Sequence, residues 1–426
     1  MLLIRNGLVV DPANDIAKRA DVVVQGGRIL RITDAESRDI LLGNDCEVID
    51  AEGCVVAPGL VDVHVHFRDP GFTHKEDIET GAKAALKGGF TDVVLMANTK
   101  PAVDNADTLT YVIEKGKTTD LKVYTCANVT KEMAGRELTE MELLLKKGAV
   151  GFTDDGIPIM DVALLEQAMR RASALRVPLS LHEENPALII NNGVNQGKAS
   201  GHFGIGGSPR EAEISLIERD LELALKTDVI LNIQHISTKE GVALVREAKK
   251  RGRNIHAEAT PHHFSLTEDA VIEYGTLAKM NPPLREEADR LAIIAGLKDG
   301  TIDIIATDHA PHSREEKERP LTEAPSGIIG LETALALGIT KLVDTGELTI
   351  SELIACMTIN PARMYRLDAG TLSEGAAADI VIFDANATQT VGNYASKSAN
   401  SPFTGQQLKG VVRYTIVDGK VVYRGK

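Results

Sequence analysis

Short apolar blocks recur through the middle of the chain, and stretches with helical spacing of Leu, Ala and Ile lie between them. An apolar run of strand length indicates a buried strand, and recurrence at every third or fourth residue indicates a helix. The predicted strands are 60–66, 91–98, 122–128, 149–155, 178–184, 229–236, 254–260 and 302–308. The clearest predicted helices are 77–87, 161–174, 210–226, 239–250 and 288–297. This alternation is typical of a parallel sheet covered by helices.

Eight strand–helix units over roughly 250 residues fit a (β/α)8 barrel of the TIM type. The main alternative is a doubly wound open sheet, which binds its ligand at a switch point and carries a glycine-rich phosphate turn. No GxGxxG motif follows the first predicted strand. We therefore predict an α/β fold with a TIM-like barrel.

The two ends of the chain follow a different pattern from the middle. Residues 1–57 alternate β-branched residues with Gly and Asn-Gly turns, and a similar pattern returns at 378–384 and 411–422. Two predicted helical segments, 330–344 and 349–364, precede this return. Strands at the two ends of a chain usually pair with each other. We predict a small β-domain from residues 1–57 plus 366–426, attached to a catalytic barrel at 58–365.

Composition narrows the function. The chain has 426 residues, 43% of them hydrophobic, so a large core can form. Its net charge of −14, with no basic block, argues against a nucleic-acid partner. No apolar run approaches the ~18 residues of a membrane span, and the N-terminal residues do not resemble a signal peptide. Four scattered cysteines form no CxxC pair. We expect a soluble cytoplasmic protein without a membrane partner.

Histidines and carboxylates lie at the ends of the predicted strands. His64 and His66 are two residues apart in the first strand, so their side chains point to the same face. The other strand ends carry Asp154 and Asp155 (fourth), His182 (fifth), His235 (sixth) and Asp308 (eighth). In a barrel these ends meet at one rim, where active sites lie. A lone histidine is usually structural, but convergence from five strands predicts a metal site.

Six potential ligands indicate two metal ions, because one zinc ion rarely takes more than four protein ligands. Asp154 and Asp155 are neighbours in a strand, so only one of them can face the barrel axis and bridge two ions. Two such ions activate water and polarise a carbonyl, which is hydrolytic chemistry on an amide-like bond. Asp308 can ligate a metal and also pass a proton to the leaving nitrogen.

Four further polar residues are candidates for binding a substrate: Arg68, Asn98, Asn281 and His312. A guanidinium group pairs best with a carboxylate, so Arg68 predicts an anionic substrate. Asn281 lies in an Asn-Pro-Pro-Leu-Arg segment, which is equally compatible with a simple turn. The loop 310–327 follows the last predicted strand and overhangs the rim. It is either a mobile lid or a solvated charged loop.

Together these residues resemble the dihydroorotases of the amidohydrolase superfamily, over nearly the whole chain. The HxH pair is shared by the whole superfamily, but the combination of segments is specific. The segments are Asp62-Val-His-Val-His-Phe-Arg-Asp-Pro-Gly71, Met96-Ala-Asn-Thr-Lys-Pro101, Phe152-Thr-Asp-Asp-Gly156, Asn281-Pro-Pro-Leu-Arg285 and Ala306-Thr-Asp-His-Ala-Pro-His312. The resemblance implies a zinc-dependent cyclic amidohydrolase that interconverts N-carbamoyl-L-aspartate and L-dihydroorotate in pyrimidine biosynthesis.

Carried over by position, the resemblance also implies roles for single residues. His64, His66 and Asp308 would hold one zinc ion, and His182 and His235 the other. Many relatives bridge the ions with a carboxylated lysine, which the segment 152–156 lacks. The aspartate before its glycine, Asp155, would therefore bridge two Zn2+ ions together with a hydroxide. The implied substrate-binding residues are His66, Arg68, Asn98, Asn281, His312, Ser326 and Gly327.

Two alternatives to this function stay open at this point. Allantoinases and dihydropyrimidinases hydrolyse other cyclic amides on the same fold, but they are expected to carry the bridging lysine and to lack Arg68. The chain could also be a non-catalytic partner of aspartate transcarbamoylase, although its complete ligand set argues against that. We further expect a homodimer, with association with aspartate transcarbamoylase as an added possibility.

Overall fold

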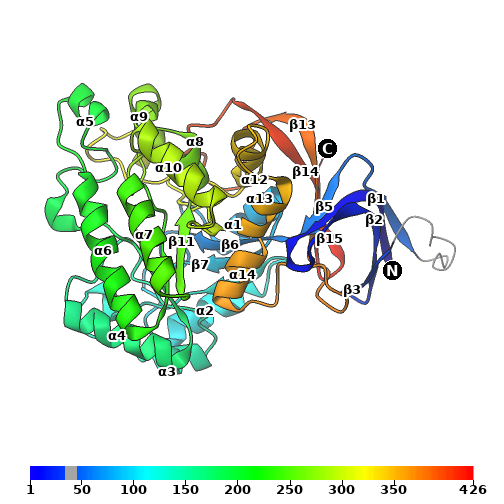
Figure 1. The fold of residues 1–426 in the computed structure, drawn as a ribbon, viewed down its shortest axis with the longest axis horizontal. Helices are drawn as coiled ribbons and strands as arrows, with labels where there is room; N and C mark the ends of the chain where they lie inside the picture. Colours follow the sequence, from blue (N-terminus) through cyan, green and yellow to red (C-terminus); the bar gives the residue numbers. More distant parts are fainter. Residues whose placement is uncertain (34–45, 426) are drawn as a thin grey trace.

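Parallel strands of the central segment close into a barrel, which confirms the predicted fold class (Figure 1). The computed structural model describes residues 1–33 and 46–425. The barrel strands are β6 (Leu60–Val65), β7 (Phe90–Leu95), β8 (Lys122–Thr125), β9 (Pro178–Leu181), β10 (Ile230–Ile233), β11 (Ile255–Ala259) and β12 (Ile304–Ile305). They form two ladders, β6-β7-β8 and β9-β10-β11-β12. A bridge between Val65 and His309 joins the first strand to the last.

The predicted fourth strand, 149–155, forms no continuous strand, and its bridges to the neighbouring strands are at Phe152. Phe152 forms parallel bridges to Ala127 after β8 and to Leu179 in β9, and so connects the two ladders. The segment leaves the ladder soon afterwards, because the Asp154 carboxylate accepts hydrogen bonds from the Val129 and Thr130 backbone N–H groups. These contacts turn the chain and end the strand at the rim.

Helices cover the outside of the barrel (Figure 1). Those predicted from spacing are α1 (Ile78–Gly88), α4 (Val162–Leu175), α6 (Arg210–Thr227), α7 (Lys239–Arg251) and α10 (Glu287–Lys298). The others are α2 (Ala106–Gly116), α3 (Met141–Lys146), α5 (Lys198–Phe203), α8 (Pro261–Ser265), α9 (Asp269–Tyr274), α11 (Arg314–Lys317), α12 (Ala334–Gly338), α13 (Ile350–Cys356) and α14 (Ile359–Tyr365). None of the helices in the described residues is long and apolar enough to cross a bilayer.

Two predicted helical segments differ from the observed helices. The segment 330–344 is helical from Ala334 in α12 and continues through Ile339–Val343 as a π-helical turn. The segment 349–364 is broken into α13 and α14 around Thr358. Pro361 lies in the first turn of α14, where proline is tolerated, and it would disrupt a helix running through from α13.

Strands from both ends of the chain form one sheet, as predicted. Its order is β15-β14-β13-β5-β1-β2-β3, and β4 pairs with β1. The strands are β1 (Leu2–Asp11), β2 (Ile16–Gln25), β3 (Arg28–Thr33), β4 (Glu47–Asp50), β5 (Val55–Pro58), β13 (Ile380–Thr390), β14 (Gln407–Val417) and β15 (Lys420–Arg424). The sheet lies to one side of the barrel, with both termini (Figure 1). The domain boundaries after residues 57 and 365 stay a prediction, and residues 34–45 and 426 lie outside the described residues.

Candidate metal centre and substrate cavity

A cavity of about 190 Å³ opens at the carboxyl ends of the barrel strands. Its lining residues are His66, Arg68, Asn98, Asp155, Gly156, His182, His235, Met280, Asn281, Asp308, Ala310, His312 and Ser326. Nearly all the candidates named from the sequence therefore face one space. His64 is fully buried next to this space, and Gly327 lies behind it, with its N–H donating to the Lys279 carbonyl.

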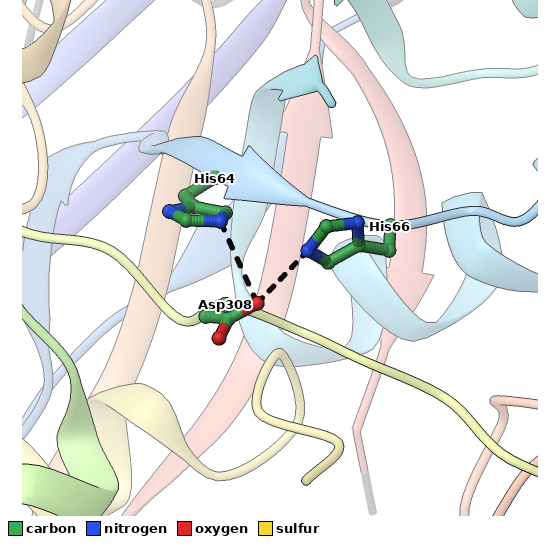
Figure 2. Close-up of side chains that lie close together, drawn as sticks. All are labelled: His64, His66 and Asp308. Carbon is green, nitrogen blue, oxygen red and sulfur yellow. Dashed lines mark hydrogen bonds and ion pairs between the residues drawn. The ribbon is translucent and has the colours of Figure 1, made fainter. Parts of the chain in front are cut away.

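The first group of ligand-type atoms comes from the first and the last strand of the barrel. His64 and His66 lie on and just after β6, and Asp308 follows β12 (Figure 2). One oxygen of Asp308, Oδ1, lies 3.0 Å from His66 Nε2 and 3.5 Å from His64 Nε2. The other Asp308 oxygen points away from both rings (Figure 2). Two nitrogens and one oxygen therefore converge on one point.

The second group is built around Asp155. Its carboxylate lies 3.6 Å from His64 Nε2 and 3.4 Å from His66 Nε2. It also lies 3.8 Å from His182 Nδ1 and 3.9 Å from His235 Nε2. Asp155 thus lies within 3.9 Å of histidines that lie on or just after three different barrel strands. Asp154 faces the other way, toward Val129 and Thr130, so the geometry separates the two aspartates that the sequence left open.

The charges in this cluster depend on one another. Burial would raise the pKa of the Asp155 carboxyl, but the imidazoles of His64, His66 and His182 hold it well below its usual value. Burial, with help from neighbouring histidines, lowers the pKa of His235 well below its usual value. Burial would lower the pKa values of His64 and His182, but neighbouring carboxylates raise both above the usual value. Metal binding at this cluster would therefore release protons.

The residues fit a zinc-like ion. His64 Nε2 is buried without a hydrogen-bond partner, and so is Nδ1 of His235. The His182 Nδ1 and His235 Nε2 atoms are 3.0 Å apart. Ligand atoms around one tetrahedral zinc ion lie about 3.3 Å apart, given metal–ligand bonds of about 2 Å. Buried ring nitrogens at this spacing next to carboxylates are the donor set that zinc prefers.

Polar residues behind the cluster orient its histidines. Glu258, on β11, accepts a hydrogen bond of 2.9 Å from His64 Nδ1 and another of 2.5 Å from Asn232. The Asn98 oxygen lies 3.0 Å from His66 Nδ1, and its amide nitrogen donates to Asp155. Glu258 was missed in the sequence. A signal was present, since it is the only charged residue in the alternating, buried strand Ile255–Ala259.

Replacing Glu258 by glutamine should weaken metal binding about 10- to 100-fold. The carboxylate accepts from two donors, His64 Nδ1 and the Asn232 amide, whereas glutamine presents one acceptor and one donor. One of the two donors then loses its partner, and His64 is no longer held with Nε2 toward the cluster. Competition with a zinc chelator measures the change.

The matched control for this variant is Glu268→Gln. Glu268 is also buried and also accepts from two donors, Asn195 Nδ2 and the Ala199 N–H, but it contacts none of the histidines of the cluster. It should keep the metal affinity of the wild type. Equal losses in both variants would show that Glu258 acts through general stability.

The opposite wall of the cavity is positively charged. Burial lowers the pKa of the Arg68 guanidinium, which donates to the Pro311 carbonyl and lies 3.4 Å from His312 Nε2. Among the described residues no carboxylate lies within ion-pair distance of Arg68. Burial and the charges of Arg68, Lys75 and Lys317 keep the pKa of His312 far below its usual value. This wall therefore has one cation, Arg68, whose charge is offset only at longer range by Asp308, Asp155 and Glu316.

Three residues of the site have backbones in the left-handed region. The φ angles are 59° at Arg68, 32° at His235 and 45° at Asp308. Side chains other than glycine avoid this region, and such strain persists only where the surrounding structure imposes it. All three residues lie just past a barrel strand, so the strained turns aim their side chains into the cavity.

Comparisons with known proteins identify the family of the chain. Residues 55–422 match the model of the Amidohydrolase family. The chain is 52% identical over 428 residues to a dihydroorotase of Clostridium acetobutylicum, covering 100% of both chains. It is 54% identical over 423 residues to a dihydroorotase of Clostridioides difficile, covering 99% of this chain and 100% of the relative.

Solved structures support the same fold. The L-hydantoinase (dihydropyrimidinase) of Arthrobacter aurescens superposes with a TM-score of 0.88 at 25% identity, covering 100% of this chain and 96% of the other. The dihydropyrimidinase of Brevibacillus agri gives a TM-score of 0.85 at 24% identity, with coverage of 99% and 95%. The matches in sequence extend over the full length and at about twice the identity of these structures. The chain belongs to the amidohydrolase family and, within it, to the dihydroorotases.

Proposed function

We propose that the chain catalyses the reversible conversion of N-carbamoyl-L-aspartate to L-dihydroorotate, a step of pyrimidine biosynthesis. The observation that carries this proposal is Arg68, a half-buried cation that lines the same small cavity as the His/Asp cluster and donates to the Pro311 carbonyl. A hydrolytic centre beside such a cation suits a cyclic amide that carries a carboxylate. The relatives of about 50% identity are named dihydroorotases, which supports the same substrate.

We assign the metal ligands by their grouping in the cavity. His64, His66 and Asp308 would hold one zinc ion, His182 and His235 a second, and Asp155 would contact both. Two zinc ions bound there would polarise the amide carbonyl and supply hydroxide near neutral pH. Glu258 and Asn98 orient His64 and His66 for this purpose.

Asp308 is the acid–base group in this proposal. Its Oδ1 faces His64 and His66, which leaves the second oxygen free toward the reacting atoms. In hydrolysis this oxygen takes the proton of the attacking nucleophile and delivers it to the amide nitrogen as the ring opens. In cyclisation the same oxygen takes the proton from the carbamoyl nitrogen.

Arg68, Asn98 and His312 would bind the substrate carboxylate, and Asn281 and Ser326 would lie around the ring, since all five line the cavity. Gly327 contributes by allowing His312 to approach closely. A Cβ atom at Gly327 would lie 2.6 Å from the His312 ring. Homodimer formation, association with aspartate transcarbamoylase and location in the cytoplasm stay predictions.

The direct test is turnover of both substrates by the zinc-loaded protein. Ring opening of L-dihydroorotate and ring closure of N-carbamoyl-L-aspartate should both be catalysed. Failure with both substrates, together with turnover of a hydantoin or of dihydrouracil, would replace this proposal with the cyclic-amide alternative.

Replacing Arg68 by methionine should lower kcat/KM for dihydroorotate roughly 100-fold, which corresponds to a loss of about 3 kcal/mol in transition-state stabilisation. The reason is that it removes charge-assisted hydrogen bonds to the substrate carboxylate. Metal content should not change. Dihydrouracil has the same ring without the carboxylate, so its turnover should change little. The measurement is kcat/KM for both substrates in the wild type and the variant.

Arg290→Met makes the same chemical change on helix α10, away from the cavity, and should leave both values unaltered. Equal losses on dihydroorotate and dihydrouracil in Arg68→Met would mean that Arg68 supports the structure of the rim. The choice of an anionic substrate would then rest on sequence similarity alone.

A further inference from the structure

The segment between β12 and α12 contributes four residues to the substrate cavity, Asp308, Ala310, His312 and Ser326. We call residues 310–327 the rim loop. Its two arms run side by side at its base, where the Ala310 N–H donates to the Ile328 carbonyl. The position of His312 depends on how this loop is held, because the residue belongs to no strand or helix of the barrel.

Asn400 links both arms of the rim loop. It lies in the connection between β13 and β14, which extends from the terminal sheet toward the barrel (Figure 1). Its side chain is 3% exposed. Its oxygen accepts from the His312 backbone N–H at 3.1 Å, and its nitrogen donates to the Ala310 and Gly327 carbonyls, both at 3.0 Å. Both donors and the acceptor of this buried amide are therefore used on the loop.

Two buried lysines hold the same loop from inside. Lys279 Nζ donates to the Leu321 and Ala324 carbonyls, each at 2.7 Å. Lys317 Nζ donates to the Pro325 and Gly327 carbonyls, at 2.9 and 3.0 Å. Both side chains are 4% exposed. These contacts favour a fixed wall over the mobile lid that the sequence also allowed.

We propose that Asn400 is a positioning residue for substrate binding, which sets His312 against the substrate carboxylate from a segment outside the barrel. The inference rests on the proposed function for the identity of the substrate. Asn400 lies outside the residues that line the cavity, so it acts through His312 and the Gly327 carbonyl. The terminal part of the chain thereby takes part in substrate recognition.

The test is a cycle of Asn400→Ala, His312→Ala and the double variant. Asn400→Ala should raise KM for dihydroorotate about tenfold, because it removes the hydrogen bonds that hold His312 in place. Both kcat and the zinc content should stay nearly unchanged. In the His312→Ala background the same change should alter KM by less than about twofold, because the residue it positions is gone. A tenfold increase in both backgrounds, or none in the wild-type background, would overturn the proposal.

A second measurement needs no substrate. Hydrogen exchange of the rim loop should be slow in the wild type and faster by about tenfold or more in Asn400→Ala, since the His312 N–H loses its acceptor. Unchanged exchange would refute the inference even if the protein acts on a different substrate. Failure of the proposed function would instead appear as no turnover of dihydroorotate by the wild type, whatever the loop does.

Two further variants keep the test decisive. If Asn400→Ala does not fold, Asn400→Asp keeps the acceptor for His312 but places an oxygen against the Ala310 and Gly327 carbonyls. It should raise both KM and loop exchange. The matched control is Asn360→Ala, which removes an amide hydrogen bond to the Asp303 carbonyl at the start of β12, away from the loop. It should leave KM and loop exchange unchanged, and a tenfold rise in its KM would count against Asn400.

Discussion

Asp155→Ala should bind less than half of the wild-type zinc and lose activity on the order of 10³-fold or more. Its carboxylate lies within 3.9 Å of ring nitrogens of His64, His66, His182 and His235, so no other residue contacts as much of the cluster. Without it, His235 loses the carboxylate within 3.9 Å of its ring, and no carboxylate joins the two groups of histidines among the described residues. Loss of metal polarisation costs several kcal/mol, and about 4 kcal/mol corresponds to this factor. Metal analysis and turnover of dihydroorotate give both values.

Asp154→Ala is the matched control, because it changes the neighbouring residue in the same way. The Asp154 carboxylate accepts from the Val129 and Thr130 backbone N–H groups, so its loss should destabilise the fold by about 1–3 kcal/mol. The zinc content of the folded protein should stay near that of the wild type. If Asp154→Ala lost the metal and Asp155→Ala kept it, the assignment of the two aspartates would be reversed.

Asp308→Asn should lower kcat by roughly 10²–10⁴-fold, the usual contribution of a general acid–base group. Asparagine has nearly the same shape and can still offer one oxygen to His64 and His66. The amide cannot take up a proton, so the variant has no group for the proton transfer assigned to the second Asp308 oxygen. The variant should remain folded and retain part of its metal. Pre-steady-state turnover of the zinc-loaded variant measures the chemical step directly.

Asp303→Asn tests the specificity of that effect. Asp303 precedes β12 at the opposite end of the barrel, where it accepts from His256 and from the Ala257 N–H. The same substitution there should leave kcat close to the wild-type value. Near-normal turnover by Asp308→Asn with both metals bound would remove Asp308 from the proton-transfer step.

The sequence predicted the barrel and the positions of most site residues for a simple reason. Barrel strands are buried on both faces, so they appear as apolar blocks, and polar residues at their ends stand out. His64, His182, His235 and Asp308 were all visible in this way. The fourth strand was overestimated, because periodicity does not reveal that Asp154 leaves the ladder to bind backbone N–H groups.

Residues that act through other residues were harder to identify. Lys279 and Asn400 lie in loops and Lys317 ends the short helix α11, all places where a lysine or an asparagine is normally solvent-exposed. Only the folded chain shows that each is buried and uses its donors on the rim loop. Their partners are backbone carbonyls, which every type of residue has, so the sequence gives no sign of these hydrogen bonds.

The bridge between Val65 and His309 has a consequence for the assembly of the molecule. It is the seam at which the barrel closes, and His66 and Asp308, 3.0 Å apart, lie on its two sides. An ion held by both residues would cross-link the first and last strands and would shorten a loop of more than two hundred residues in any partly opened state. Such cross-links gain stability slowly, with the logarithm of loop length. The metal-free protein should therefore open first along this seam.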